Sequence, residues 1–440
     1  MSAIGVDSVA ELYAAIPDRL RTSGPLDLPA GLASEQEVER LVGDLLSRNR
    51  TTQEYTSFLG HGCYPHYVPA ICSEINGRAE FLTAYAGEPY EDHGKWQAIF
   101  EYTSLMSDLL EMDVVTVPTY DGLQAAATAL RMAVRMTGRK TVLVSEAIPE
   151  ALRIKLDSYL DGHAAIATIP VDITTGTLDT AAARDLLGPA VAGVLLQTPN
   201  VFGVVEADVE AIAAAAHAHG ALLVASCDPI SLGFLPAPAS LGADIVCGDI
   251  QSLGLGMHFG GAHGGYLAVH DEERFVFELP SRLFGLAPTR KRGELGFTDV
   301  AYERTSLARR ESGVEWVGTA AALWCITSAV YLSAMGPAGL GELGSTVAAH
   351  TRYAIERLGA VPGVSVPFAQ SPHWRELVIQ FDRHDVAEVN KSLLAHGIFG
   401  GVDISRQFPD LGNALLICVT EVHGVDDIER LAVALEGICR

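Results

Sequence analysis

Short apolar runs alternate with segments of helical periodicity through the middle of the chain. The runs TVLVS from Thr141, AAIATIP from Ala164 and VAGVLLQ from Val191 are typical of buried strands. Helices are expected between and after them, at residues 149–159, 180–187 and 209–219. Strands that alternate with helices predict a largely parallel sheet with crossover helices on its faces, which is an α/β fold.

The flanking regions carry other patterns. Residues 1–50 predict helical segments split by the turn SGPLDLP, with Ser34 and Glu37 forming a capping box. The last part, 361–440, has the order β-β-α-β-α, typical of a small α+β domain. We therefore expect an N-terminal helical arm (1–60), a large α/β domain (61–335) and a small C-terminal domain (336–440).

Two apolar runs near the middle of the chain end beside polar and glycine-rich segments. The run Ala221 to Ala225 leads into Cys227-Asp228-Pro229, and the run Ala243 to Cys247 leads into GDIQSLGLGMHFGG. Glycines let the backbone of such a loop approach a ligand closely. Two buried strands that end beside this loop predict a ligand crevice of the α/β type.

The residues at this crevice resemble an incomplete cofactor site. Pyridoxal-phosphate enzymes of the aspartate-aminotransferase-like group place an Asp at a strand end and a lysine on the loop after the next strand. The Asp keeps the pyridine nitrogen protonated, and the lysine forms a Schiff base. Asp228 fits the first role, but Gln251 and Ser252 stand where the lysine would fall. Neither an amide nor a hydroxyl can form an imine, so the covalent anchor is missing.

Six segments give a more specific resemblance. They are FLGHGCYPHYVP (Phe58–Pro69), EFLTAY (Glu80–Tyr85), YDG (Tyr120–Gly122), TPNVFG (Thr198–Gly203), DPISLG and GDIQSLGL. Together they resemble the first subunit of two-subunit glycine decarboxylase, the P-protein of the glycine cleavage system. The matches run in order from about Val9 to the C-terminus.

This resemblance implies a fold and a division of labour. It implies the aspartate-aminotransferase-like fold of pyridoxal-phosphate enzymes, with a degenerate cofactor site on this chain. A partner subunit would supply the lysine and hold the pyridoxal phosphate. The pair, a heterotetrameric glycine dehydrogenase (aminomethyl-transferring), would decarboxylate glycine and pass the aminomethyl group to a lipoylated carrier protein.

Seven side chains are candidates for the wall of the cleft, and none is expected to be a covalent catalyst. They are Tyr85, Tyr120, Asp228, Gln251, Ser252, Arg309 and Arg310. The arginine pair, which matches a pair in the family, could fork a substrate carboxylate or an acid of the partner. The equal alternative is two solvent-facing arginines on an acidic chain. Asp121 is expected to cap the helix that follows, because a carboxylate there opposes anion binding.

Two loops depart from the family pattern and leave other functions open. Residues Ala86 to Glu91 replace a run containing Pro and Gln, and Glu311 to Gly318 places Glu315 and Trp316 where small polar groups are usual. One alternative is a paralogue that works with a partner on another amino acid or on a glycine unit in a biosynthetic pathway. The other is a purely structural or regulatory subunit.

Composition limits the classes of partner. The hydrophobic fraction of 49% and charged fraction of 19% are those of a globular protein, and a net charge of −24 argues against nucleic acid. The densest basic triplet, Arg290 to Arg292, is expected in a solvated loop. The uncharged stretch Thr319 to Leu340 is long enough to cross a membrane, but its Ser, Thr, Gly and Pro residues favour a buried helix, so no membrane is expected.

The cysteines and histidines indicate compartment and metal content. Seven scattered cysteines without a C-x-x-C pair, and an N-terminus unlike a secretory signal, favour the cytoplasm. His258, His263 and His270 lack zinc-site spacing, so no metal is expected.

Overall fold

The computed structural model describes residues 1–22, 24–81, 95–260, 262–280, 282–315, 317 and 321–439. Tyr85, the segment Ala86 to Glu91 and Trp316 therefore lie outside the described residues. The chain separates into two compact units, Met1–Glu54 and Tyr55–Arg440. The domain boundaries expected at residues 60 and 335 stay a prediction.

The first unit consists of short helices. They are η1 (Ser2–Ile4), η2 (Val9–Tyr13), η3 (Asp18–Leu20) and α1 (Glu35–Leu46). The Ser34 side chain caps α1 by accepting a hydrogen bond from the Glu37 N–H, as the sequence predicts, and the Glu37 carboxylate accepts one from the Ala33 N–H. None of the described residues of this unit is buried.

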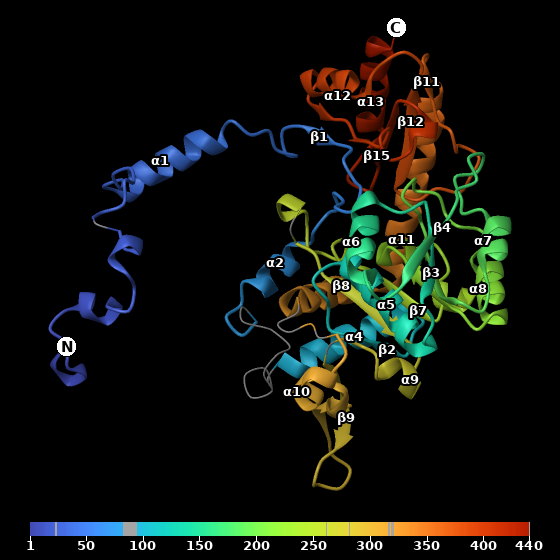
Figure 1. Ribbon diagram of the computed structural model, residues 1–440. Coiled ribbons are helices and arrows are strands. Elements are labelled where there is room, and N and C mark those ends of the chain that lie inside the picture. Colours follow the sequence, from blue (N-terminus) through green and yellow to red (C-terminus); the bar gives the residue numbers. More distant parts are fainter. Residues whose placement is uncertain are drawn as a thin grey trace. The chain divides into compact units, whose positions relative to one another are not determined.

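The second unit is built around a mixed sheet with the strand order β2-β8-β7-β6-β5-β3-β4 (Figure 1). The strands are β2 (Val114–Val115), β3 (Thr141–Ser145), β4 (Ala165–Ile169), β5 (Val191–Gln197), β6 (Leu222–Ser226), β7 (Ile245–Asp249) and β8 (Gly265–Val269). Strands β3 to β7 run parallel, whereas β8 and β2 are antiparallel to their neighbours. The predicted α/β fold with a largely parallel sheet is confirmed.

Helices cover both faces of this sheet because its strands are apolar on both faces. Val142 and Val144 point into one core with α5 and α6, and Leu143 between them points into the other with α4, α8 and α11. The helices, with the short helical turns between them, are α2 (Ala70–Asn76), α4 (Trp96–Leu110), α5 (Gly122–Thr137), α6 (Glu150–Leu160), α7 (Thr180–Leu186), α8 (Val209–Ala218), η5 (Pro229–Gly233), η6 (Pro238–Leu241), η7 (His258–Gly260) and α9 (Glu273–Val276).

The long helix α11 (Ala322–Gly359) leads from the large sheet to the C-terminal region. It is the one described helix long and apolar enough to cross a membrane. However, it kinks at Gly336, which has φ 59° and ψ 178°, followed by Pro337. Its buried residues before the kink, such as Tyr331, belong to the core of the large sheet, in agreement with the expected buried helix.

The C-terminal region forms a separate antiparallel sheet with the order β11-β12-β15-β14. Its strands are β11 (Val364–Ser365), β12 (Glu376–Phe381), β14 (Val402–Asp403) and β15 (Ala414–Cys418), and its helical elements are α12 (Val386–Ala395), η10 (Pro409–Leu411) and α13 (Val425–Ile438). The strand β1 (Thr56–Ser57) pairs with β13 (Ile398–Phe399) and ties the start of the second unit to this region.

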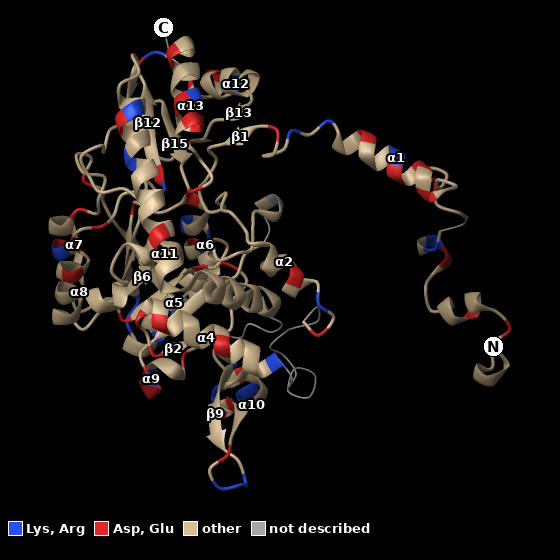
Figure 2. Cartoon of the chain, turned by 180° about the vertical axis from the view of Figure 1, so that it is seen from behind, with Lys and Arg blue, Asp and Glu red and all other residues tan. Residues whose placement is uncertain are grey.

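A hairpin follows α9, in a region where the sequence pattern predicts no strands. The region 279–310 contains the antiparallel pair β9 (Leu283–Pro288) and β10 (Leu295–Val300), followed by η8 (Tyr302–Arg304), α10 (Ser306–Arg309) and η9 (Arg310–Ser312). Glycines and charges interrupt the alternation of these strands, so their pattern is weak. The basic triplet at residues 290–292 is exposed at the tip of the hairpin (Figure 2).

A glycine fixes the approach of the two sheets. Gly203, in the loop after β5, has φ 77°, and a Cβ there would lie 1.9 Å from the Glu376 carbonyl oxygen at the start of β12.

We expect Gly203→Ala to lower the free energy of unfolding by more than about 2 kcal/mol, measured by urea denaturation. Gly397→Ala is the matched control, because Gly397 has φ 72° with nothing within 4 Å of the added Cβ. Equal losses in both variants would contradict the collision.

Candidate functional site

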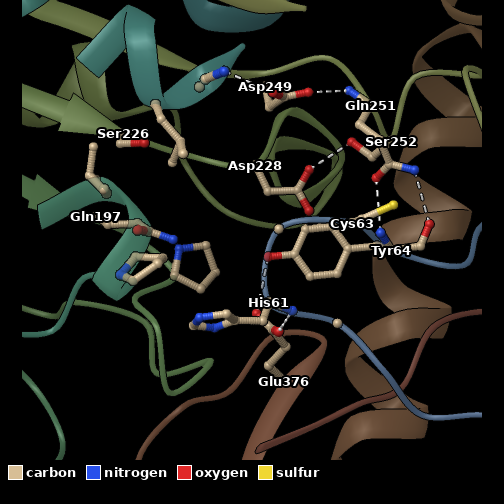
Figure 3. A pocket seen from close by; sticks show the side chains of 18 of the residues that line it. His61, Cys63, Tyr64, Gln197, Ser226, Asp228, Asp249, Gln251, Ser252 and Glu376 are labelled. Atoms are coloured by element: carbon tan, nitrogen blue, oxygen red, sulfur yellow. Dashed lines mark hydrogen bonds between the residues drawn. The ribbon is translucent and has the colours of Figure 1, made fainter. Parts of the chain in front are cut away.

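A cavity of about 380 Å³ lies at the carboxyl ends of β5, β6 and β7, where the sequence predicts the crevice. Figure 3 shows side chains from separate segments of the chain that converge on it, among them His61, Asp228 and Glu376. Among the described residues, its charged and polar lining consists of His61, Tyr64, Asp121, Gln197, Asn200, Ser226, Asp228, Asp249, Gln251, Ser252, His263, Trp374, Arg375 and Glu376. Its volume is within the range of small-molecule pockets, about 300–1,000 Å³.

Asp228, after the end of β6, is held by four donors of its own chain. Its Oδ1 accepts hydrogen bonds from the Ile230 N–H at 3.1 Å and the Ser252 hydroxyl at 3.0 Å. Its Oδ2 lies 2.5 Å from Nη1 of Arg375 and 3.3 Å from the indole nitrogen of Trp374. The aspartate is therefore paired with a positive charge, and both its oxygens are engaged.

Arg375 is a buried cation that joins the C-terminal region to this aspartate. Its guanidinium stacks 3.2 Å from the centroid of the Tyr64 ring, and Nη1 donates to Nε2 of His66 at 3.2 Å. The His66 ring in turn bonds Glu421 at 2.8 Å. Burial, the largest single effect, disfavours the charge, but the Asp228 carboxylate and the other nearby acidic groups together outweigh it and raise the pKa of Arg375. The arginine is thus held as a cation inside the protein.

Gln251, at one of the two positions where a lysine would stand, forms a clamp between two loops. Its side-chain oxygen accepts a hydrogen bond from the Tyr64 N–H at 3.0 Å. Its nitrogen donates to the Tyr64 carbonyl at 3.1 Å and to the Gly256 carbonyl at 2.9 Å. The side chain pairs with both backbone polar groups of Tyr64, as a neighbouring strand would, and Gln251 is only 2% exposed. Its polar atoms are used to hold structure.

The start of α5 is occupied by two carboxylates of the chain. Asp121 caps the helix, as the sequence predicts, by accepting from the Gln124 N–H at 2.6 Å. Asp249, at the end of β7, accepts from the Gly122 N–H at 2.8 Å. His263 lies 3.2 Å from the same Asp249 carboxylate, and this hydrogen bond raises the pKa of His263. Negative charge therefore already sits at the positive end of the helix dipole.

A buried carboxyl completes the wall. Glu376 accepts hydrogen bonds from the His61 N–H at 2.6 Å and from the Tyr64 hydroxyl at 3.2 Å. Burial raises the pKa of Glu376, although the Arg375 guanidinium opposes this effect. Glu376 and Arg375 are adjacent, so the start of β12 carries both the positive and the negative group of this wall.

The structure brings together three of the predicted site residues. Asp228, Gln251 and Ser252 all line the cavity (Figure 3). Tyr120 is 56% exposed and outside the described lining, although its neighbour Asp121 belongs to it. Tyr85, another predicted site residue, lies outside the described residues.

The arginine pair lies elsewhere. Arg309 and Arg310 are exposed and outside the described cavity lining. Arg309 donates to the Glu303 carbonyl and lies 5.6 Å from the ring centroid of Phe277. Glu315, one of the departures from the family, accepts a hydrogen bond from Thr128 of α5 at 2.7 Å. The roles of Tyr85, Tyr120 and the arginines in a shared cleft stay predictions.

The chain is similar to proteins of one family along almost its whole length. Residues 1–435 match the family described as glycine cleavage system P-protein. The chain belongs to this family. It is 37% identical to the probable glycine dehydrogenase (decarboxylating) subunit 1 of Desulfitobacterium hafniense, over 100% of this chain and 97% of that protein. The subunit 1 of Carboxydothermus hydrogenoformans is 38% identical, over 99% and 96%. The family resemblance read from the sequence is confirmed, as is the assignment to a glycine dehydrogenase subunit.

Solved structures give the same result for the fold. A crystal structure of glycine decarboxylase (P-protein) of the glycine cleavage system, in inhibitor-bound form, matches with a TM-score of 0.88 and 34% identity, over 99% of this chain and 96% of that chain. The sphingosine-1-phosphate lyase of Burkholderia pseudomallei matches with a TM-score of 0.67 at 16% identity, over 97% and 93%, and shows the fold alone. The predicted pyridoxal-phosphate-dependent fold with a small C-terminal domain is confirmed.

The described residues of this pocket do not fit pyridoxal phosphate. None of the five lysines of the chain lines the described cavity, and Gln251 and Ser252 are both committed to internal hydrogen bonds. Asp228 is already paired with Arg375. The lysine that would bond the aldehyde is therefore absent, and the carboxylate that would bind the pyridine nitrogen is already paired.

Sequence reasoning missed most of the residues that take these positions. Tyr64 and Asp249 lie within segments that carried the family resemblance, so the resemblance pointed to them without giving their roles. Trp374 and Arg375 stand at the start of an apolar run assigned to a strand, far along the chain from Asp228. No spacing rule links them, because only the packing of the two sheets brings them to the aspartate.

The ion pair gives a first prediction for the site. Asp228→Asn keeps the volume but leaves the Arg375 guanidinium buried without its counter-charge. We expect a loss of about 3–5 kcal/mol in the free energy of unfolding, measured by urea denaturation. The control is Asp157→Asn, which removes an exposed pair with Arg153 at 3.2 Å and should cost less than about 1 kcal/mol. Similar losses in the two variants would contradict the role given to the buried pair.

The stability of the chain should depend on pH through Glu206, whose carboxylate accepts a hydrogen bond from the cavity residue Asn200. Burial raises the pKa of Glu206 from 4.5 to about 7, against the opposing hydrogen bonds from Asn200 and the Leu178 N–H. Between these values the folded state binds more protons than the unfolded state, so stability falls as pH rises. Glu206→Gln does not titrate, and its stability relative to wild type should rise across this window, by at most about 3 kcal/mol.

Chemical denaturation at pH 5 and pH 8 measures this difference. The exposed Glu210→Gln, on α8, is the control and should keep the wild-type profile. If the free energy of unfolding changes by the same amount between pH 5 and pH 8 in wild type, Glu206→Gln and Glu210→Gln, the raised pKa of Glu206 is contradicted.

Proposed function

We propose that the chain is the non-lysine subunit of a glycine decarboxylase of the glycine cleavage system. Its partner is a second subunit that bears the cofactor lysine and holds pyridoxal phosphate. The pair decarboxylates glycine and passes the aminomethyl group to a lipoylated carrier protein. The observation that carries the proposal is the combination of a full-length match to subunit 1 relatives with Gln251 and Ser252 at the lysine positions.

The names of the relatives support a second subunit, because a subunit 1 implies another chain. When bound by that partner, pyridoxal phosphate supplies an electron sink for the charge left as carbon dioxide departs. This chain contributes structure: Gln251 clamps the loop that carries Tyr64, and Arg375 holds the end of β6 to the C-terminal sheet. A rigid wall of this kind keeps the opposing surface of the partner in one geometry.

The exposed candidates act at the shared cleft in this proposal. Tyr120, Arg309 and Arg310 are available on the surface of the described chain. An arginine there forks the carboxylate of an amino-acid substrate or an acidic group of the partner. The complex works in the cytoplasm, which is supported by seven cysteines that are all unpaired.

Reconstitution tests the activity. The chain is mixed with a lysine-bearing second subunit and lipoylated carrier, and exchange of labelled bicarbonate into glycine is followed. Exchange should require both subunits and be absent with either alone. Absence of exchange in an assembled pair would contradict the glycine activity, and exchange with a different amino acid would support the diverged paralogue.

Alanine variants separate a cleft role from a purely structural one. Loss of a charged hydrogen bond costs about 1.5–3 kcal/mol, so Arg309→Ala should lower turnover of the assembled pair about 10- to 100-fold. Arg292→Ala, at the hairpin tip, is the control and should leave turnover within about twofold of wild type. If Arg309→Ala and Tyr120→Ala both assemble and keep full turnover, the structural or regulatory subunit is favoured.

A further inference from the structure

The absent lysine is one difference from a cofactor-binding pocket, and the charges of the pocket form another. We propose that Arg375 and Asp249 take up the charge positions that a phosphorylated pyridine cofactor requires, at Asp228 and at the N-terminus of α5. The pocket of this chain is therefore closed to such a cofactor even when a lysine is restored. This concerns the chain itself and holds whether or not the assembled pair decarboxylates glycine.

The first position is the Asp228 carboxylate. A carboxylate has about four acceptor sites, and the Ile230 N–H, Ser252, Trp374 and Arg375 supply four donors. A pyridinium N–H could bond here only by displacing one of them. The donor that carries the equivalent positive charge is Arg375, so the guanidinium already does for Asp228 what a protonated ring nitrogen would do.

Arg375 is fixed in this place by packing on several sides. The residue is 5% exposed and its guanidinium lies between the Asp228 carboxylate and the Tyr64 ring. Its backbone has φ 63°, and its N–H donates to the Thr351 hydroxyl of α11 at 3.1 Å. Moving the side chain out would leave the buried aspartate without a counter-charge, which is costly in a low-dielectric interior.

The second position is the N-terminus of α5. A phosphate placed there would bond the first amides of the helix and benefit from its dipole. Here the Gly122 N–H donates to Asp249 and the Gln124 N–H donates to Asp121. The end of β7 packs so closely that a Cβ on Gly122 would lie 2.9 Å from the Asp249 Cβ. A phosphate would therefore meet two carboxylates, and the N–H groups of Gly122 and Gln124 would already be bonded to them.

The basic groups His263 and Arg375 of the remaining lining are already engaged by carboxylates of the chain. His263 lies 3.2 Å from the Asp249 carboxylate and is bonded to it. Among the described lining residues the basic side chain that is always charged is Arg375, which is paired with Asp228. Glu376 adds a further acidic group beside it. The cavity of about 380 Å³ has the volume of a ligand pocket, so lack of space does not exclude the cofactor. The charges and hydrogen bonds of the lining exclude it.

The experiment restores the lysine with and without release of the charges. Gln251→Lys and Ser252→Lys are made singly and then each combined with Asp249→Asn and Arg375→Leu. Pyridoxal phosphate is titrated by absorbance, and borohydride reduction with peptide mass analysis locates the labelled lysine. The exposed Ser73→Lys on α2 measures the background from a surface lysine.

Each single lysine variant should bind no more tightly than the Ser73→Lys control. At least one combined variant, shown by circular dichroism to be folded, should bind at least tenfold more tightly and carry the label at the new lysine. Tight binding by a single lysine variant would overturn the proposal. A folded set of combined variants that binds no better than the single ones would also overturn it.

A milder variant keeps the test decisive if removal of Arg375 unfolds the chain. Ser252→Lys with Asp249→Asn leaves the buried ion pair intact. It should bind pyridoxal phosphate more tightly than Ser252→Lys alone, whereas pyridoxal, which lacks the phosphate, should show no gain. An equal gain for both compounds would contradict the role of Asp249 as the occupant of the phosphate position.

Discussion

The buried ion pair between Asp228 and Arg375 is the constraint on which the rest of the pocket depends. Two charges are taken out of water, and each is costly unless the other stays in place. The aspartate belongs to the large sheet, the arginine to the start of β12, and the stacked Tyr64 to the segment between β1 and α2. One interaction therefore brings three distant parts of the chain to the same point.

Other contacts in the cavity repeat the same principle on a smaller scale. Gln251 satisfies both peptide groups of Tyr64, and Asp249 satisfies an amide at the start of α5. Buried polar groups are expensive when unpaired, and a pocket of this fold exposes many of them for a ligand to use. In this chain its own side chains supply the hydrogen-bond partners of these groups. The pocket therefore keeps the shape of a ligand site, but its polar groups stabilise the fold.

The sequence predicted the regular part of the fold well and the charge network poorly. Strands β3 and β5 fall at the residues expected, because their strong apolar runs decide them locally. Asp228 and Ser252 were found together because they follow adjacent strands of one sheet. Arg375 could not be found in this way, since its neighbours come from a different sheet. The β9–β10 hairpin was missed for a local reason, the weak alternation of its two strands.

The Gln251 clamp bears on how this chain can change over generations. A single substitution to lysine would forfeit three hydrogen bonds of a nearly inaccessible side chain at once. The new lysine would gain no bound cofactor in return while Asp228 remains paired with Arg375. A lysine at position 251 would therefore begin with a loss of stability. Each internal contact that occupies a ligand position thus raises the cost in stability of turning this pocket into a cofactor site.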